Sequence, residues 1–207
     1  MIKGLTLDGI RISLKGEPLL SLDAAIAPGE VLTVMGASGS GKSSLLAYIA
    51  GFLNRDFAAH GRVVLDGTEV TALPAEQRRI GLLFQDAMLF PHLSVLGNLL
   101  FGLPATVPDR QARAQAALAE AGLEGFGTRD PATLSGGQKA RVALLRLLLS
   151  EPHAVLLDEP FSKLDANLKD DIRTLVFTRL KARGLPGLLV THDEADAKAA
   201  GGRVIRI

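Results

Sequence analysis

Short runs of branched apolar residues alternate along this chain with longer segments of helical periodicity. The apolar runs occupy residues 31–35, 80–84, 154–157, 187–190 and 203–207. Runs of this length and composition are typical of buried strands. Helical patterns occupy residues 42–51, 137–150 and 166–183. Because strands that alternate with helices favour a largely parallel sheet, we predict an α/β fold.

Residues 61–70 depart from this alternation. They are rich in β-forming residues and contain Asp66-Gly67, a hairpin turn signal. We therefore predict a small antiparallel β part near the N-terminus. Pro74, a little further on, stands where the first turn of a helix tolerates proline.

Helical patterns dominate the middle of the chain. Ser94 is placed to cap a helix that runs through Leu100, and residues 109–121 form an alanine-rich helix that Gly122 ends. We expect one domain with an α/β core, formed by residues 1–85 and 151–207. A helical subdomain at about 86–150 is inserted into it.

Composition excludes several classes of protein. The chain has 207 residues, 47% of them hydrophobic and 22% charged, with a net charge of +1. This balance does not support nucleic acid or anionic lipid as the main partner. The absence of cysteine excludes disulfides and thiolate metal sites and is compatible with the cytosol.

No apolar stretch is long enough for a signal peptide or a membrane span, so we expect a soluble chain. The mean hydropathy of +0.25 fits either a well-filled core or an additional apolar surface for a partner.

The first chemical motif is a glycine-rich loop between the strand 31–35 and the helix 42–51. It consists of Gly36, Ala37, Ser38, Gly39, Ser40, Gly41, Lys42 and Ser43, and Ser44 follows. The loop fits the P-loop pattern, in which backbone N–H groups and a helix N-terminus bind phosphate. Lys42 is expected to reach the β- and γ-phosphates, and Ser43 to ligate Mg²⁺. The alternative is a chance glycine-rich turn.

Two adjacent carboxylates, Asp158 and Glu159, end the apolar strand that begins at Ala154. Neighbouring residues of a strand point to opposite sides, so Asp158 is expected to face a metal and Glu159 an attacking water. Phosphoryl transfer needs both roles. A solvated acidic turn after a core strand is the other interpretation.

A second helix start with phosphate-binding chemistry precedes the helix 137–150. It comprises Ser135, Gly136, Gly137 and Gln138. A nucleotide has one γ-phosphate, which the P-loop already holds. The segment is therefore interpreted as contacting a nucleotide bound to another copy across a two-fold interface. A plain N-cap with a flexible turn explains the same residues.

His192 follows the strand 187–190. A γ-phosphate contact and an ordinary polar residue at a strand end are both compatible with this position. His60, His92 and His153 lack such a setting, and we assign them no role.

Together these motifs resemble those of the ATP-binding cassette (ABC) ATPases over nearly the whole chain. Residues 36–43 resemble the Walker A motif, 134–138 match the signature motif letter for letter, and 156–160 resemble the Walker B motif with its following glutamate. Residues 162–165 resemble the D-loop, Gln85 the Q-loop glutamine and His192 the switch histidine. The full ordered set is specific to that family, whereas a P-loop alone is widespread. Residues 84–102 resemble the importer branch, in particular small predicted bacterial import ATPases.

The resemblance implies a P-loop NTPase core and an ATPase that powers transport of an unknown solute, with import as the expected direction. The implied cofactors are ATP and Mg²⁺. Glu159 would polarise the attacking water and His192 would contact the γ-phosphate. Lys42 is also expected to be a catalytic residue. Gln85 would touch both Mg²⁺ and water, so the metal set is Ser43, Gln85 and Asp158. Asp165 would help to assemble the dimer interface.

The implied partners are a second copy of this chain, permease subunits and, indirectly, a solute-binding protein. The two copies would pair head to tail, with the P-loop of one facing residues 135–138 of the other. A groove beside Gln85 would receive a short permease helix. The expected location is cytoplasmic, peripheral on the inner face of the cell membrane.

The sequence departs from the family pattern at the adenine site. Family members usually carry an aromatic residue that stacks on the base, and the matching position here is Leu14. The only tyrosine, Tyr48, lies on another segment. The hypothesis that follows is weaker base discrimination. Lys139-Ala140 after the signature motif is interpreted as a neutral change, and no regulatory domain is expected after His192.

Three other functions fit these motifs less well. A soluble ABC ATPase acting on ribosomes or DNA usually has two cassettes or a long coiled coil, and the sequence has neither. A nucleotide sensor without turnover conflicts with the presence of Glu159 and His192. A P-loop kinase leaves residues 135–138 without a role. The motifs do not identify the transported solute.

Overall fold

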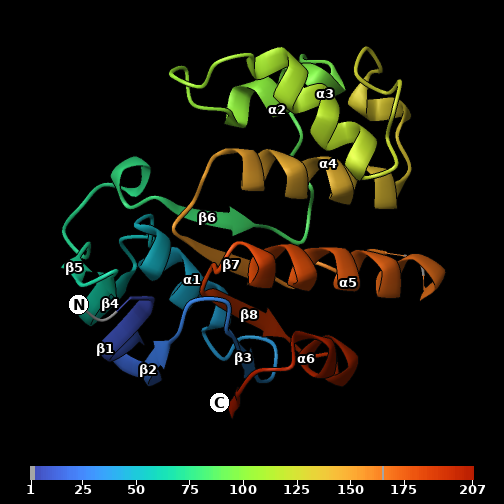
Figure 1. Ribbon diagram of the computed structural model, residues 1–207. Coiled ribbons are helices and arrows are strands. Elements are labelled where there is room, and N and C mark those ends of the chain that lie inside the picture. Colours follow the sequence, from blue (N-terminus) through green and yellow to red (C-terminus); the bar gives the residue numbers. More distant parts are fainter. Residues whose placement is uncertain (1–2, 165) are drawn as a thin grey trace.

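Two sheets form the framework of the protein (Figure 1). The computed structural model describes residues 3–164 and 166–207. In this part of the chain the larger sheet has the order β6-β7-β8-β3-β9, and all its neighbouring strands are parallel. Its strands are β3 (Val31–Met35), β6 (Ile80–Leu83), β7 (Ala154–Asp158), β8 (Gly187–Thr191) and β9 (Val204–Arg206).

The smaller sheet, with the order β2-β1-β4-β5, is antiparallel. It consists of β1 (Leu5–Leu14), β2 (Glu17–Ile26), β4 (Phe57–Leu65) and β5 (Thr68–Glu69). The predicted α/β fold, with a mostly parallel sheet and a small antiparallel part, is confirmed.

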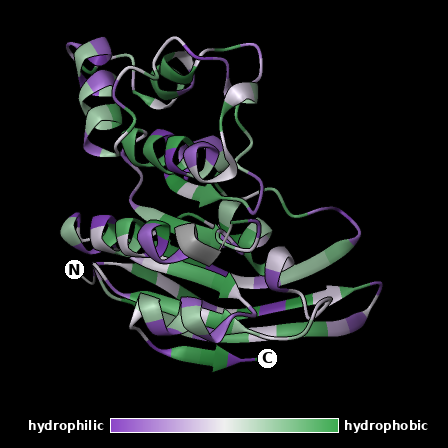
Figure 2. Ribbon diagram, turned by 90° about the vertical axis from the view of Figure 1, so that its right-hand side faces the viewer, coloured by the Kyte–Doolittle hydropathy of each residue, from purple (hydrophilic) through white to green (hydrophobic). Residues whose placement is uncertain are grey.

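Helices cover both faces of the parallel sheet. α1 (Lys42–Ala50) packs with both sheets in one apolar core, and α4 (Gly136–Leu149) and α5 (Ala166–Ala182) cover the opposite face. Along β7, Leu156 belongs to the first core, while Val155 and Leu157 belong to the second. A strand buried on both faces has a continuous apolar run, which is why the sequence shows runs instead of alternation. Figure 2 shows this as hydrophobic colour along the central strands.

The described segment between β6 and β7 contains helices and turns, as predicted. Here α2 (Val95–Gly102), α3 (Arg110–Glu120) and α4 form a third apolar core. α4 belongs to two cores, because Leu144 and Leu148 pack toward the parallel sheet and Leu145 and Leu149 toward α2 and α3. α4 therefore connects the helical part to the sheet. The division of the chain at residues 86 and 150 remains a prediction.

Local signals placed most element ends correctly. Ser94 caps α2 by accepting a hydrogen bond from the Gly97 N–H at 3.1 Å, and α1 ends at Gly51 in the left-handed conformation. The Asp66-Gly67 turn joins β4 to β5, with φ of 50° and 81°. Pro74 is followed directly by a short 3₁₀ turn, Ala75–Gln77, and not by an α-helix, and α2 extends past Leu100 to Gly102.

The sequence did not predict α6 (Glu194–Ala200) or the separate bounds of β1 and β2. α6 has seven residues, too few for a periodic pattern, although Asp193 caps it by accepting from the Ala195 N–H. Register shifts between β1 and its neighbours interrupt the period of two. Within residues 3–164 and 166–207, no helix has both the length and the hydropathy needed to cross a bilayer.

Candidate functional site

The candidate site lies where three parallel strands end side by side. Met35 of β3 pairs with Thr191 of β8, and Val190 of β8 pairs with Asp158 of β7. The glycine-rich loop follows Met35, Glu159 follows Asp158, and His192 follows Thr191. The sheet therefore brings together groups that are far apart in sequence, at the edge where open α/β sheets bind ligands.

The loop 36–43 has a backbone path that requires glycine. Gly39 and Gly41 have φ of 85° and 90°, which side chains rarely adopt. A Cβ on Gly36 would lie 2.6 Å from the Ile207 carbonyl oxygen, and one on Gly41 would lie 2.9 Å from Leu19 Cγ. The loop thus passes close to the sheet edges while its backbone turns at the start of α1.

Lys42 is held at the mouth of this loop. Its side chain is almost buried, and its ammonium donates to the carbonyl oxygens of Gly36 at 2.9 Å and Ala37 at 2.6 Å. Ser40 Oγ lies 3.4 Å from the same nitrogen. These contacts fix a positive charge where the loop folds back, and phosphate oxygens compete well for such donors.

Ser43 and Asp158 meet next to Lys42. The Ser43 hydroxyl donates to Asp158 Oδ1 at 3.3 Å. Burial raises the pKa of the Asp158 carboxyl, and the hydrogen bond from Ser43 opposes that rise. Hydroxyl and carboxylate oxygens are the protein ligands that Mg²⁺ prefers, so this pair fits the predicted metal. A partly buried carboxylate is better stabilised beside a cation than alone.

Glu159 leaves β7 in an unusual conformation. Its φ is 44°, and its backbone is held by a bond from its N–H to the Val190 oxygen and by one from Ser162 Oγ to its own oxygen, both 2.9 Å. Its Oε1 lies 3.1 Å from His192 Nδ1. Asp158 thus contacts Ser43 and Glu159 contacts His192, while their expected roles toward a metal and a water stay predictions.

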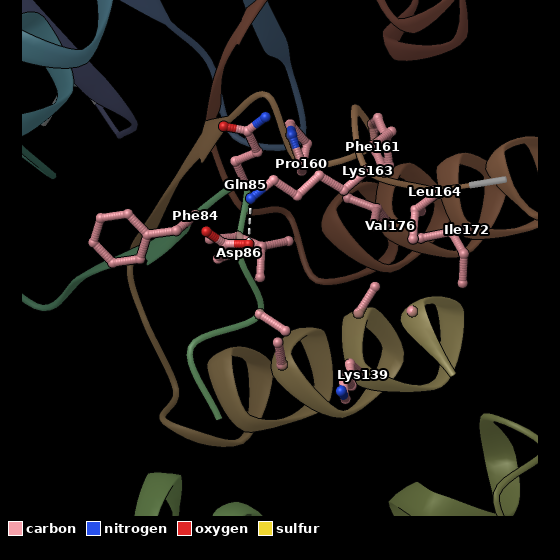
Figure 3. A pocket seen from close by; sticks show the side chains of 15 residues that line it. Phe84, Gln85, Asp86, Lys139, Pro160, Phe161, Lys163, Leu164, Ile172 and Val176 are labelled. Carbon is pink, nitrogen blue, oxygen red and sulfur yellow. Dashed lines mark hydrogen bonds and ion pairs between the residues drawn. The ribbon is translucent and has the colours of Figure 1, made fainter. Parts of the chain in front are cut away.

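Gln85 follows β6 and lines a cavity of about 150 Å³ between the sheet and α4. The cavity is also lined by Gly136, Lys139, Pro160 and Lys163. In Figure 3 Gln85 and Phe84 diverge, and Asp86 points to Lys163, to which it is joined by an ion pair of 2.5 Å. Gln85 is thus placed between the Glu159 segment and α4, and its predicted metal contact stays a prediction.

Residues 135–138 form a capping box at the start of α4. Ser135 Oγ accepts from the Gln138 N–H at 3.3 Å, and Gln138 Oε1 accepts from the Ser135 N–H at 3.0 Å. Ser135 and Gly136 are exposed and Gly137 is buried. The plain N-cap interpretation is correct for the local structure, and the exposed hydroxyl leaves the second interpretation open. Since α4 and α1 cover opposite faces of the sheet, the segment does not line the Lys42 loop.

The structure gives no contact for some of the predicted site residues, and it reveals one residue that the sequence did not indicate. Asp165, predicted at an interface, lies outside the described residues. No side-chain hydrogen bond is described for Ser38, within the loop, or for Ser44, directly after it, although Ser44 lines a depression with Ser43 and Phe84. Sequence reasoning missed Arg173, which is buried among carboxylates near His192. A helical arginine carries no motif signal, so only the fold could reveal it.

Comparison with known proteins decides the family. Residues 19–162 match the sequence profile described as ABC transporter. The chain belongs to the ABC transporter family. As a member it is an ATP-binding ATPase subunit, and the alternative of a soluble ABC ATPase unconnected with transport is not supported.

Two of the relatives of this ABC protein are named for different solutes, and a third is named for none. It is 48% identical over 183 residues to the uncharacterised ABC transporter ATP-binding protein YnjD of Escherichia coli K12, covering 87% of this chain and 84% of the relative. It is 42% identical to the thiamine import ATP-binding protein ThiQ of Jannaschia sp., covering 97% and 87%. It is 41% identical to an Fe(3+) ions import ATP-binding protein of Rhizobium meliloti, covering 89% of this chain but 52% of that one. The chain thus spans about half of the iron-related protein.

The raised pKa of Asp158 leads to a stability test. Burial disfavours its ionised form, so the charge lowers folded-state stability at pH 7, and the deficit disappears as pH falls through the folded-state pKa. Asp158→Asn should therefore raise the Tm at pH 7 in EDTA without nucleotide, with a gain that narrows toward pH 4. Calorimetry across this pH range checks it, with the exposed Asp171→Asn as control. A lower Tm at pH 7 would contradict the assignment.

Proposed function

We propose that this chain binds ATP with Mg²⁺ and hydrolyses it to drive uptake of a solute through a membrane permease. The observation that carries the proposal is the convergence of Lys42, Ser43, Asp158, Glu159 and His192 at the ends of three adjacent strands. The names of the thiamine and Fe(3+) relatives support import. Because those two solutes differ in chemistry, family membership does not identify the cargo.

The phosphates would be held by the backbone N–H groups of 36–43 and by Lys42, with Ser44 beside them. Lys42 offers a compact positive charge. Gly36, where a Cβ would clash with the Ile207 carbonyl oxygen, lets the loop begin close to the sheet without a side chain. Mg²⁺ would be held by Ser43, Asp158 and Gln85, and when bound it neutralises charge on the phosphates. The Ser43–Asp158 contact supports the first two ligands.

Glu159 would take a proton from the attacking water. One of its carboxylate oxygens lies near His192, and its left-handed backbone directs it away from the course of the strand, which supports this role. His192, whose side chain is 66% exposed, would hold Glu159 and contact the terminal phosphate. General-base help of this type accounts for about 10²–10⁴-fold in rate.

The site of one chain would be completed by a second copy. Ser135, Gly136, Gly137 and Gln138 form the N-terminus of a capped helix, and helix N-termini suit anions. Ser135 and Gly136 are exposed, yet the segment does not line the Lys42 loop. A head-to-tail pair would bring them to the partner's nucleotide. Two copies, rather than one, would then form each complete site.

Permease binding would use the apolar surface around the segment that leads into the helical part. Phe52, Phe84, Met88 and Phe101 are the largest exposed apolar side chains there, with exposures of 40% to 66%. The ring centres of Phe52 and Phe84 lie 6.4 Å apart, and those of Phe90 and Phe101 lie 4.5 Å apart with the ring planes tilted by 59°. Exposed apolar clusters of this type mark protein contacts. A short permease helix would bind here, with a solute-binding protein acting through the permease.

The first prediction from the proposed function concerns the turnover of ATP. Glu159→Gln should keep ATP binding, lower kcat by at least about 100-fold because the base is lost, and trap an ATP-bound dimer. Phosphate release and light scattering with ATP and Mg²⁺ measure both effects. Glu151→Gln, on an exposed loop, is the matched control. Full turnover by Glu159→Gln would show that the assigned base is wrong.

Lys42→Ala should instead lose tight ATP binding, because the positive charge at the loop is removed. A titration with ATP measures this loss.

The second prediction concerns the base. Leu14 ends β1 opposite Phe57 and offers no ring of its own. Since a stacked aromatic contributes about 1–3 kcal/mol, GTP should displace a fluorescent ATP analogue nearly as well as ATP does. Leu14→Tyr should raise affinity for both nucleotides through added stacking. If GTP fails to displace ATP, the hypothesis of weak discrimination is wrong.

The third prediction concerns the permease. Phe101→Asp should leave the ATPase rate of the purified chain unchanged but prevent capture of a permease from detergent-solubilised membranes, because a charge replaces apolar contact. Arg113→Asp, on an exposed part of α3, serves as the control. With the captured permease, the solute and binding protein that raise ATPase activity identify the cargo. Undiminished capture by Phe101→Asp would place the contact elsewhere.

A further inference from the structure

The proposed mechanism leaves a buried ionic cluster between α5 and α6 unexplained. Its centre is Arg173, whose side chain is 8% exposed. The guanidinium donates to Asp196 Oδ1 at 2.6 Å through Nε, to Asp193 Oδ2 at 2.9 Å through Nη2 and to Asp170 Oδ1 at 2.9 Å through Nη1. Asp196 is itself buried, at 4% exposure. A planar fork with several fixed donors suits such simultaneous contacts.

One arm of this cluster fixes the segment that carries His192. Asp196 Oδ2 accepts from the Thr191 hydroxyl at 2.7 Å, and Thr191 Oγ1 accepts from the Asp193 N–H at 3.0 Å. Arg173 also binds the Asp193 carboxylate directly. The residues on both sides of His192 are therefore bound to one network, while the His192 side chain is exposed.

The other arm reaches the segment that carries Glu159. The Arg173 guanidinium lies 5.9 Å from the centre of the Phe161 ring, and Phe161 is fully buried two residues after Glu159. Phe161 packs edge-on against Phe177 of α5, with ring centres 5.8 Å apart. Arg173 thus contacts both segments whose side chains meet at the 3.1 Å contact between Glu159 and His192.

We propose that Arg173 is a positioning residue for ATP hydrolysis, which holds the His192 segment through Asp193 and Asp196 so that His192 stays against Glu159. The inference rests on the proposed function, since it assigns Arg173 an effect only through His192. Arg173 itself does not touch the reacting groups. Loss of its fork would leave Asp196 with the Thr191 hydroxyl alone. The Asp193 carboxylate would keep only the Ala195 N–H at 2.8 Å and the more distant Lys169 ammonium at 3.9 Å.

The charges of the cluster favour this role over a general stabilising one. Three carboxylates, those of Asp170, Asp193 and Asp196, face two cations, Arg173 and Lys169. Asp170 is 86% exposed and needs no partner, whereas Asp193 and Asp196 flank the histidine. Although burial opposes it, hydrogen bonding to Asp196 and Asp170 raises the pKa of Arg173. The cation therefore persists at every pH at which the protein is assayed.

A double-mutant cycle tests the proposal on this 207-residue chain. Arg173→Gln should lower kcat about 100-fold, as expected for a displaced catalytic group, with ATP affinity within about twofold of the original. In the His192→Ala background the same change should alter kcat by no more than about twofold, because the group being positioned is gone. Arg173→Lys, which keeps the charge without the fork, should recover part of the loss. Arg179→Gln on the same helix, where Arg179 pairs with Glu120, should leave kcat unchanged.

The outcomes separate the two proposals. Unchanged kcat in Arg173→Gln, or an equal loss with and without His192, overturns the positioning role. Full activity of His192→Ala overturns the assigned role of His192 and, with it, this inference. If Arg173→Gln does not fold, Asp196→Asn replaces it, since it keeps the bond from Thr191 and removes one charge. It should show a smaller loss of kcat that again disappears in the His192→Ala background.

Discussion

Parallel pairing of β3 with β8 and of β8 with β7 is the constraint on which the rest of the site depends. The pairing sets Met35 beside Thr191 and Val190 beside Asp158, so that three chain segments emerge at one edge. Each segment then carries one group of candidate site residues: the glycine-rich loop, the two carboxylates and the histidine. A shift of one residue in either register would turn the side chains to the wrong face, because neighbours on a strand alternate. The apolar cores on both sides of the sheet prevent such a shift.

The same edge is where the protein accepts local instability. The loop is crowded enough at Gly36 and Gly41 to exclude any side chain, and Glu159 occupies a backbone conformation unusual for a residue other than glycine. Asp158 is kept partly out of water, which disfavours its charge. These features are concentrated at the ends of the strands, while the strands themselves are packed with aliphatic residues. Strain and unfavourable charge at a site are maintained when the surrounding packing determines the structure strongly enough.

α4 gives the helical part a direct connection to this edge. One side of the helix belongs to the core under the sheet and the other to the core with α2 and α3. Its N-terminus borders the cavity that Gln85 and Pro160 also line, and the ion pair of Asp86 with Lys163 crosses that cavity. A displacement of the helical part would therefore act on residues next to Glu159. This arrangement places α4 between the candidate site and the helical part that carries Phe101, one of the residues of the proposed contact surface.

Sequence alone determined the elements and the chemistry that is local in the chain. The apolar runs, the glycines of 36–43, the cap at Ser94 and the turn at Asp66-Gly67 act within a few residues, so their signals can be read directly. It also supplied the family resemblance, because the motifs keep their order. The sequence did not predict the short helix α6, because its pattern is too brief. It did not predict the bounds of strands β1 and β2, because register shifts interrupt their pattern. Only the tertiary structure decided that Ser43 meets Asp158, that Glu159 meets His192 and that Arg173 binds both flanks of that histidine. Those contacts join residues up to 115 positions apart, and they depend on strand register and helix packing, which no local pattern encodes.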